Sequence, residues 1–128
     1  MNLRLLLDTA TFIWALQSPD RLSARALSAL QDDDAVRELS ALSITEIAIK
    51  NSKGKLNVHR EDILVGLADL RMQVLPWNSR HAFKLFDLPL HHGDPFDRQI
   101  IAQALAENIP IVTSDAIFQL YAGISLIW

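Results

Sequence analysis

The sequence predicts an α/β fold: a three-layer α/β/α sandwich around a mainly parallel, roughly five-stranded central sheet. Short apolar runs alternate along the chain with segments whose apolar residues recur at helical spacing. This alternation favours parallel strands joined by right-handed crossover helices. Half of the 128 residues are hydrophobic, which is enough to cover both faces of such a sheet. No linker, repeat or low-complexity segment is apparent, so we expect a single domain over residues 1–128.

The strands are expected where apolar residues form short continuous runs. Leu3–Leu7 is apolar except for Arg4, which is typical of a central strand buried on both faces. The other expected strands cover residues 39–42, with a start that could reach back to 36, and residues 72–77, 109–113 and 124–127.

The helices are expected where the apolar period is helical. They cover residues 12–16, 22–30, 43–50, 61–70, 79–88, 94–106 and 114–121. Ser23 and Ser79 are the expected caps of two of them, and Ser43 with Glu46 has the spacing of a capping box. Pro95 stands in the favoured first position of the helix that Asp94 opens.

The composition excludes several classes of protein. The chain has no cysteine, which excludes a disulfide framework and suits a reducing compartment, so we expect a cytoplasmic protein. The net charge of −3 argues against a basic coat for nucleic acid, but a nuclease needs only a local acidic pocket. No run approaches the roughly 20 apolar residues of a membrane span, and Asp8 interrupts the short N-terminal run too early for a signal peptide.

Four segments place an acid at the end of a strand or the start of a helix: residues 5–8, 43–46, 94–97 and 112–115. Parallel strands end at one edge of a sheet, so we expect these acids to meet where the strand order reverses. At about 5 Å, each pair of carboxylates repels by about 3 kcal/mol at an effective dielectric near 20. Such a cluster must bind protons or a divalent cation. Mg²⁺ and Mn²⁺ prefer oxygen ligands, and Mg²⁺ keeps waters that can attack phosphorus.

Other interpretations of the same residues stay open. An acid at a helix N-terminus also caps free N–H groups, for about 0.5–2 kcal/mol, and Asp94 fits this role best. A zinc site at His91 and His92 is disfavoured because adjacent residues of an extended segment face opposite ways. We expect His59 and His81 to lie on the surface.

The motifs together resemble those of PIN-domain ribonucleases, specifically the VapC-like toxins of bacterial type II toxin–antitoxin modules. They occur in family order at Leu5–Thr9, Glu46–Lys50, Leu88–Arg98 and Val112–Asp115, and the resemblance runs from about residue 3 to the last residues. Asp-Pro-Phe-Asp-Arg at 94–98 is the most specific of them. The resemblance implies an endoribonuclease that depends on Mg²⁺ or Mn²⁺, an antitoxin that blocks its site, and a toxin homodimer.

The resemblance also implies roles for individual residues. The catalytic and metal-ligating acids are Asp8, Glu46, Asp97 and Asp115. The accessory residues are Asp94, Thr113 and Ser114. Apart from the resemblance, the positive charges of Arg98, Lys50 and Lys53 make them candidate phosphate contacts, and a solvated surface charge is the other interpretation of each. Two positions depart from the family pattern: Ala10 stands where many relatives have His, and Thr45 where an aromatic residue often precedes the Glu. Neither is an expected ligand.

Two other classes of function were weighed against a nuclease. A domain that has lost turnover could act by binding an antitoxin or RNA, with Trp14, Phe12 and Ile49 as candidates for its partner groove; core packing is the other interpretation of Phe12 and Ile49. A phosphotransfer domain needs an acceptor Asp after the middle strand, where this chain has Asn78-Ser79. A dehalogenase-type phosphatase needs a second Asp at position 10, which is Ala.

Overall fold

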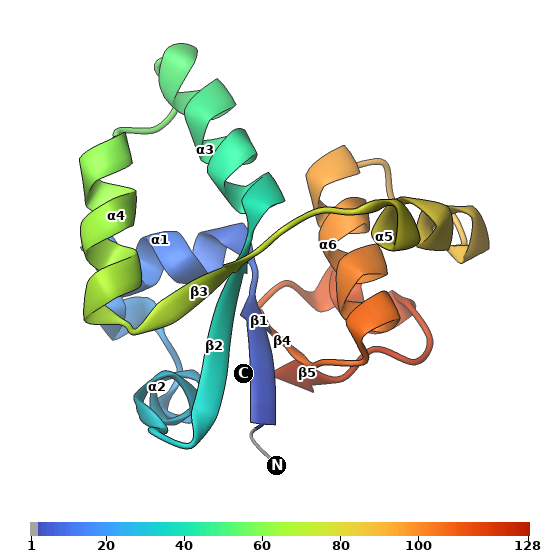
Figure 1. The fold of residues 1–128 in the computed structure, drawn as a ribbon, viewed down its shortest axis with the longest axis horizontal. Coiled ribbons are helices and arrows are strands. Elements are labelled where there is room, and N and C mark those ends of the chain that lie inside the picture. Colours follow the sequence, from blue (N-terminus) through green and yellow to red (C-terminus); the bar gives the residue numbers. More distant parts are fainter. Residues whose placement is uncertain (1–2) are drawn as a thin grey trace.

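Five parallel strands form the centre of the computed structural model, which describes residues 3–128 (Figure 1). Their order across the sheet is β3-β2-β1-β4-β5, and every neighbouring pair is parallel. The strands are β1 (Leu3–Leu7), β2 (Ala35–Ser40), β3 (Met72–Leu75), β4 (Ile111–Val112) and β5 (Leu126–Ile127). The predicted α/β/α class with a parallel five-stranded sheet is therefore confirmed.

Within residues 3–128, six α-helices and three short 3₁₀ turns connect the strands. The α-helices are α1 (Thr9–Gln17), α2 (Ala24–Gln31), α3 (Ala41–Ser52), α4 (Arg60–Asp69), α5 (Ser79–Lys84) and α6 (Pro95–Glu107). The 3₁₀ turns are η1 (Pro19–Arg21), η2 (Leu85–Asp87) and η3 (Ala116–Leu120). Among residues 3–128, no helix has the length and apolar character needed to cross a membrane.

The central strand β1 divides the apolar interior into two layers. Leu5 and Leu7 pack on one side with residues of α1 to α4, whereas Leu6 packs on the other with residues of α6 and η3. All three side chains are fully buried. Figure 1 shows the same division, with α1, α2 and α4 on one side of the sheet and α5 and α6 on the other. Alternating side-chain directions on a strand buried on both faces account for this continuous apolar run.

The start of α3 differs from its prediction. Ser40 ends β2 and caps α3, because its hydroxyl accepts a hydrogen bond from the Leu42 backbone N–H at 3.1 Å. The helix therefore begins at Ala41, and the expected strand over 39–42 ends two residues early. The capping box of Ser43 and Glu46 is wrong for the same reason: both residues lie inside the helix, with buried side chains.

The other caps are mostly as the sequence predicts. Ser23 caps α2 by accepting from the Ala26 backbone N–H, and Asp94 caps α6. Asn78, rather than Ser79, caps α5. β3 ends at Leu75 because the following Pro76 has no N–H to donate to a neighbouring strand.

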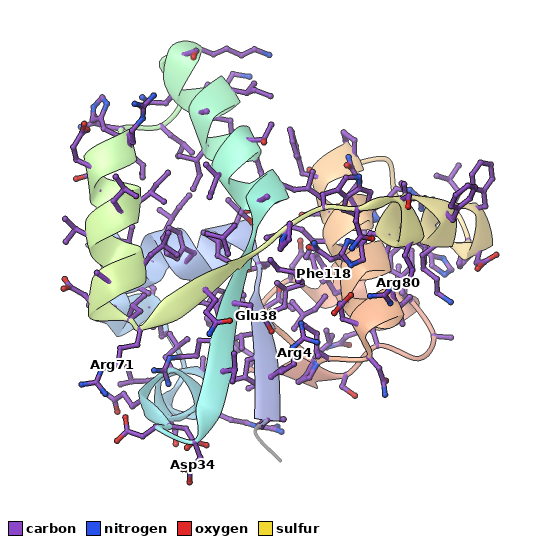
Figure 2. All side chains as sticks on the ribbon, in the orientation of Figure 1. Arg4, Asp34, Glu38, Arg71, Arg80 and Phe118 are labelled. Carbon is purple, nitrogen blue, oxygen red and sulfur yellow. The ribbon has the colours of Figure 1, made fainter. Side chains whose placement is uncertain are left out.

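A partly buried ionic network explains why Arg4 interrupts the apolar run of β1. Its guanidinium donates to both carboxylate oxygens of Glu38, at 2.7 and 2.9 Å, and to Glu107 at 3.0 Å. Glu107 also binds Arg80 and accepts from Nε2 of His81 at 2.9 Å. Figure 2 shows Arg4 between β1 and α6, and Arg80 beside α6. The network ties β1 and β2 to the helices on one face.

His81 is fully buried, so its predicted surface position is wrong. The Asn78 backbone N–H donates to Nδ1 of the imidazole at 3.1 Å, which leaves Nε2–H to donate to Glu107. Burial costs little because both ring nitrogens have partners. The hydrogen bond from His81, with those from Arg4 and Arg80, lowers the pKa of Glu107 to about 2.

We predict that Glu107→Gln destabilises the fold by about 2 kcal/mol at pH 7, since charged hydrogen bonds to Arg4 and His81 are lost. A lowered folded pKa stabilises the protein above the unfolded value of 4.5, and this contribution disappears as the pH falls toward 2. Urea unfolding at pH 7 and pH 3 measures both effects. Glu61→Gln, at an exposed position of α4, is the control. Equal stability of the Glu107 variant and the parent at pH 7 would contradict the prediction.

Candidate active site

The strand order reverses between β1 and β4. β2 and β3 lie on one side of β1 in the sheet, and β4 and β5 lie on the other side. A parallel sheet forms its binding crevice at the carboxyl ends of the strands beside such a reversal. Asp8 directly follows β1 and Thr113 directly follows β4, so both stand at this crevice.

A pocket of about 360 Å³ opens there, and five acids line it. They are Asp8, Glu46, Asp94, Asp97 and Asp115. The remaining lining residues are Thr9, Ala10, Trp14, Lys50 and Ser114. The structure thus brings the four predicted catalytic acids together with Asp94, although they come from the end of β1, from α3, from the start of α6 and from the segment after β4. We call this space the acid pocket.

Asp8 is held rigidly at the end of β1. Its Oδ2 accepts from the Thr113 hydroxyl at 2.5 Å, and its Oδ1 accepts from the Thr11 backbone N–H at 2.8 Å. Burial raises the pKa of Asp8, and these hydrogen bonds oppose that effect. Thr113 also accepts from the Asp115 backbone N–H at 3.0 Å. One hydroxyl therefore orients two of the acids.

Glu46 is fixed by two partners. Its carboxylate accepts from the Thr9 hydroxyl at 2.7 Å and from Nζ of Lys50, one helical turn along α3, at 2.6 Å. The Thr9 hydroxyl also lies 2.8 Å from Oγ of Ser43, which explains why Ser43 is buried. The Glu46 contact raises the pKa of Lys50, so this lysine stays charged and acts as a counter-ion inside the acid pocket.

Asp97 shows the electrostatic effect of the cluster most clearly. Burial, and then the negative charge of Asp94, raise the pKa of Asp97 to about 7, with further contributions from Glu46, Asp115 and Asp8. The other four acids all interact electrostatically with Asp97. At neutral pH, Asp97 is therefore partly protonated unless a cation compensates the charge.

The donor set of the pocket fits a hard divalent cation. It offers carboxylate oxygens with a single ammonium group, Lys50, as the only basic lining residue. Within residues 3–128, no three His, Cys, Asp or Glu side chains converge closely enough to hold one ion by themselves. Mg²⁺ does not require such a cage, because it is usually held by one or two carboxylates together with waters and substrate phosphates.

Two candidate phosphate contacts do not line this pocket. Arg98 donates to the Pro89 carbonyl at 2.8 Å and to the Tyr121 hydroxyl at 3.1 Å, so its guanidinium holds the loop before α6. Lys53 is exposed at the C-terminal end of α3. Lys50 does line the pocket, but it is paired with Glu46.

One residue beside the site was missed by sequence reasoning. Nε2 of His92 lies 3.5 Å from Oδ2 of Asp97, while its Nδ1 lies 2.7 Å from the Tyr121 hydroxyl. The nearness of His92 to Asp97 in the sequence could have indicated their contact. No sequence signal indicates the contact of His92 with Tyr121, because that contact depends on the packing of η3 against α6.

The sequence also matches a known family model over nearly its whole length. The model describes the PIN domain and covers residues 5–124. This chain belongs to the PIN domain family. The predicted family is thereby confirmed, and the acid pocket lies entirely within the matched segment.

Solved structures share the fold of this PIN domain at low sequence identity. A chain of VapBC2 from Rickettsia felis, bound to a DNA fragment from its promoter, superposes with a TM-score of 0.74 at 18% identity, and 97% of each chain is covered. A chain of VapBC-1 from nontypeable Haemophilus influenzae gives 0.69 at 21% identity, covering 97% of this chain and 96% of the other. FitAcB from Neisseria gonorrhoeae gives 0.55 at 18%, with 95% of each covered. No curated protein matches the sequence.

We predict that Asp97→Asn stabilises the metal-free PIN domain at pH 8. Between pH 3.8 and about 7, folded Asp97 keeps a proton that the unfolded chain releases, so stability falls as the pH rises. The neutral amide removes this loss. We expect a gain of about 1–2 kcal/mol, less than the full pKa difference, because solvent screens a side chain that is 26% exposed.

Urea unfolding in a chelating buffer at pH 8 and pH 4 measures this gain. It should be present at pH 8 and small at pH 4. Asp34→Asn, in an exposed turn far from the pocket, is the control. A gain of the same size at both pH values would show that electrostatic repulsion is not its cause.

Proposed function

We propose that this PIN domain is a Mg²⁺- or Mn²⁺-dependent endoribonuclease and the toxin component of a bacterial type II toxin–antitoxin module, acting in the cytoplasm. The observation that carries the proposal is the acid pocket: five carboxylates against one ammonium group, at the reversal point of a parallel sheet. PIN domains are generally nucleases and typically use divalent metals. Such a pocket suits hydrolysis of a phosphodiester, whose charged phosphate needs a compensating cation.

The chain's own residues have distinct tasks in this proposal. Asp8 and Asp97, helped by Asp115, would hold one or two divalent ions together with waters and the substrate phosphate, and Glu46 would orient the attacking water or accept its proton. When bound, a divalent ion supplies stabilisation of negative charge on the scissile phosphate and a more acidic water. Thr113 keeps the Asp8 carboxylate aimed at the pocket, and Thr9 does the same for Glu46.

Lys50 would fix the orientation of the Glu46 carboxylate through their contact at 2.6 Å. Asp94 contributes mainly by fixing the start of α6: its carboxylate accepts from the Phe96 and Asp97 backbone N–H groups at 2.9 and 3.0 Å. This places the Asp97 side chain on the first turn, facing the other acids.

We predict that the parent protein cleaves single-stranded RNA with Mg²⁺ and loses cleavage on chelation. Asp97→Asn should lower the rate at least about 100-fold, because a charged group at the reacting centre is removed. Gel electrophoresis of end-labelled RNA measures the rate, and Asp34→Asn should cleave like the parent. Equal cleavage by the Asp97 variant would defeat the assignment, and intact RNA in every preparation would favour a domain that only binds partners.

The proposed antitoxin partner is supported by a groove between α3 and α4. The groove has a volume of about 460 Å³, and its apolar lining residues are Ile44, Ile47, Ala48, Val58, Ile63, Leu64, Leu67 and Val74. Leu64 is 59% exposed. A large apolar side chain that stays this exposed to water is typical of a surface that binds a partner. The VapBC complexes share this fold, so we assign the groove to an apolar segment of the antitoxin. Of the earlier candidates for a partner groove, Phe12 is fully buried and Ile49 is 40% exposed.

We predict that Leu64→Glu weakens binding of the antitoxin encoded beside this chain at least about tenfold, because it places a charge in the apolar groove. Val65→Glu is the matched control: Val65 is 58% exposed on the same helix but lines a different pocket. Co-expression followed by titration calorimetry measures both. Equal losses in the two variants would mean that the groove is not the binding site.

The proposed homodimer is supported by a second exposed surface. Phe83 and Phe86 are 71% and 86% exposed, and their rings stack with centroids 6.3 Å apart. Leu90, which follows Phe86 by four residues in the sequence, is 79% exposed. A second copy of the chain is our proposed occupant.

A further inference from the structure

A second pocket adjoins the acid pocket across the segment that follows β4. It has a volume of about 360 Å³, at the small end of the range typical of ligand sites. Its lining residues are Arg25, Thr113, Ser114, Asp115, Gln119, Leu126 and Trp128. Ser114 and Asp115 line both pockets, so a chain that crosses this segment reaches from one into the other.

The aromatic wall of the second pocket is held in a fixed orientation. Trp128 is half-buried and packs edge to face against Trp14, with ring centroids 5.9 Å apart. Trp14 is itself held by Arg21, whose guanidinium carbon lies 4.1 Å from the indole centroid. Trp14 lines the acid pocket, so the two indoles join the pockets on a second side. A rigid indole loses little entropy when a flat ligand stacks on it.

The polar residues of the second pocket complement a nucleotide. The amide of Gln119 can both donate to and accept from a base edge. Arg25 is exposed on α2 and forms no ion pair with any residue of 3–128, so its charge is available to a phosphate. An aromatic face beside a basic group is the usual composition of a single-stranded nucleic-acid site.

We propose that the second pocket binds the base of a nucleotide next to the scissile phosphate of single-stranded RNA. The base stacks on Trp128, and Arg25 contacts a phosphate on its flank. This inference rests on the proposed nuclease function and deepens it: the acid pocket holds the reacting phosphate, and the second pocket positions the strand. Since the strand would cross Ser114 and Asp115, the bound nucleotide lies within one or two positions of the cleaved bond.

Binding is measured in an Asp97→Asn background with Mg²⁺, by fluorescence anisotropy of a short labelled RNA. Trp128→Ala should weaken binding about tenfold, within the range for loss of one stacked base, whereas Trp128→Phe should retain most of the affinity. A set of RNAs, each with one abasic position, locates the base: one member of the set should bind the Trp128→Ala variant and its parent equally. Thermal unfolding confirms that each variant is folded.

Arg25 gives an independent test through salt dependence. Arg25→Ala should reduce the slope of log affinity against log salt by about 0.7, as expected for loss of one phosphate contact on a single strand. Arg60→Ala, at an exposed position of α4, should leave the slope unchanged. Equal slopes for the two variants would overturn the role of Arg25.

The remaining outcomes separate this inference from the proposed function. Equal affinity of Trp128→Ala and its parent for every RNA overturns the base-binding pocket while leaving cleavage at the acid pocket intact. The base-binding pocket is likewise overturned if Trp128→Ala no longer binds the antitoxin but binds RNA with the affinity of its parent. Conversely, if Asp97→Asn cleaves RNA like the parent, the catalytic assignment fails, and the binding measurements still decide the fate of the second pocket.

Discussion

Charge crowding at one edge of a parallel sheet is the constraint on which this structure depends. Five carboxylates line the acid pocket, and Lys50 is the one basic residue among them. Burial, and then the negative charges of the neighbouring acids, raise the pKa of Asp97 to about 7. A fold tolerates such a cluster only if other interactions hold the contributing segments in place. The Arg4 network and the two apolar layers supply those interactions in this chain.

The structural and chemical interpretations of the acids turn out to be compatible. Asp8, Asp94 and Asp115 each cap a helix or 3₁₀ turn and also line the acid pocket. In each case one carboxylate oxygen accepts from backbone N–H groups. This bond fixes the side chain while the second oxygen is left for another partner. Capping is therefore a means of orienting these acids, and it does not argue against a chemical role.

Much of the fold and the membership of the acid cluster could be predicted from the sequence, because both follow from local patterns. The apolar alternation locates the strands, and an acid after each critical strand locates the crevice.

The predictions that were wrong share a different cause. Ser43 and Glu46 match a capping box, yet Ser40 starts α3 earlier and turns both side chains inward. Surface placement of His81 fails because its partner, Glu107, lies 26 residues away along the chain. The pairing of Arg98 with Tyr121 depends equally on tertiary packing, which no local pattern records.

The shared wall of the two pockets has a consequence for how such enzymes diverge. Ser114 and Asp115 line both pockets, so under the proposed function a substitution there would alter turnover and recognition at once. Gln119 and Trp128, by contrast, line only the second pocket. If the second pocket binds a base as proposed, exchanging these two side chains would change the preferred target sequence while the acids of the acid pocket stay the same.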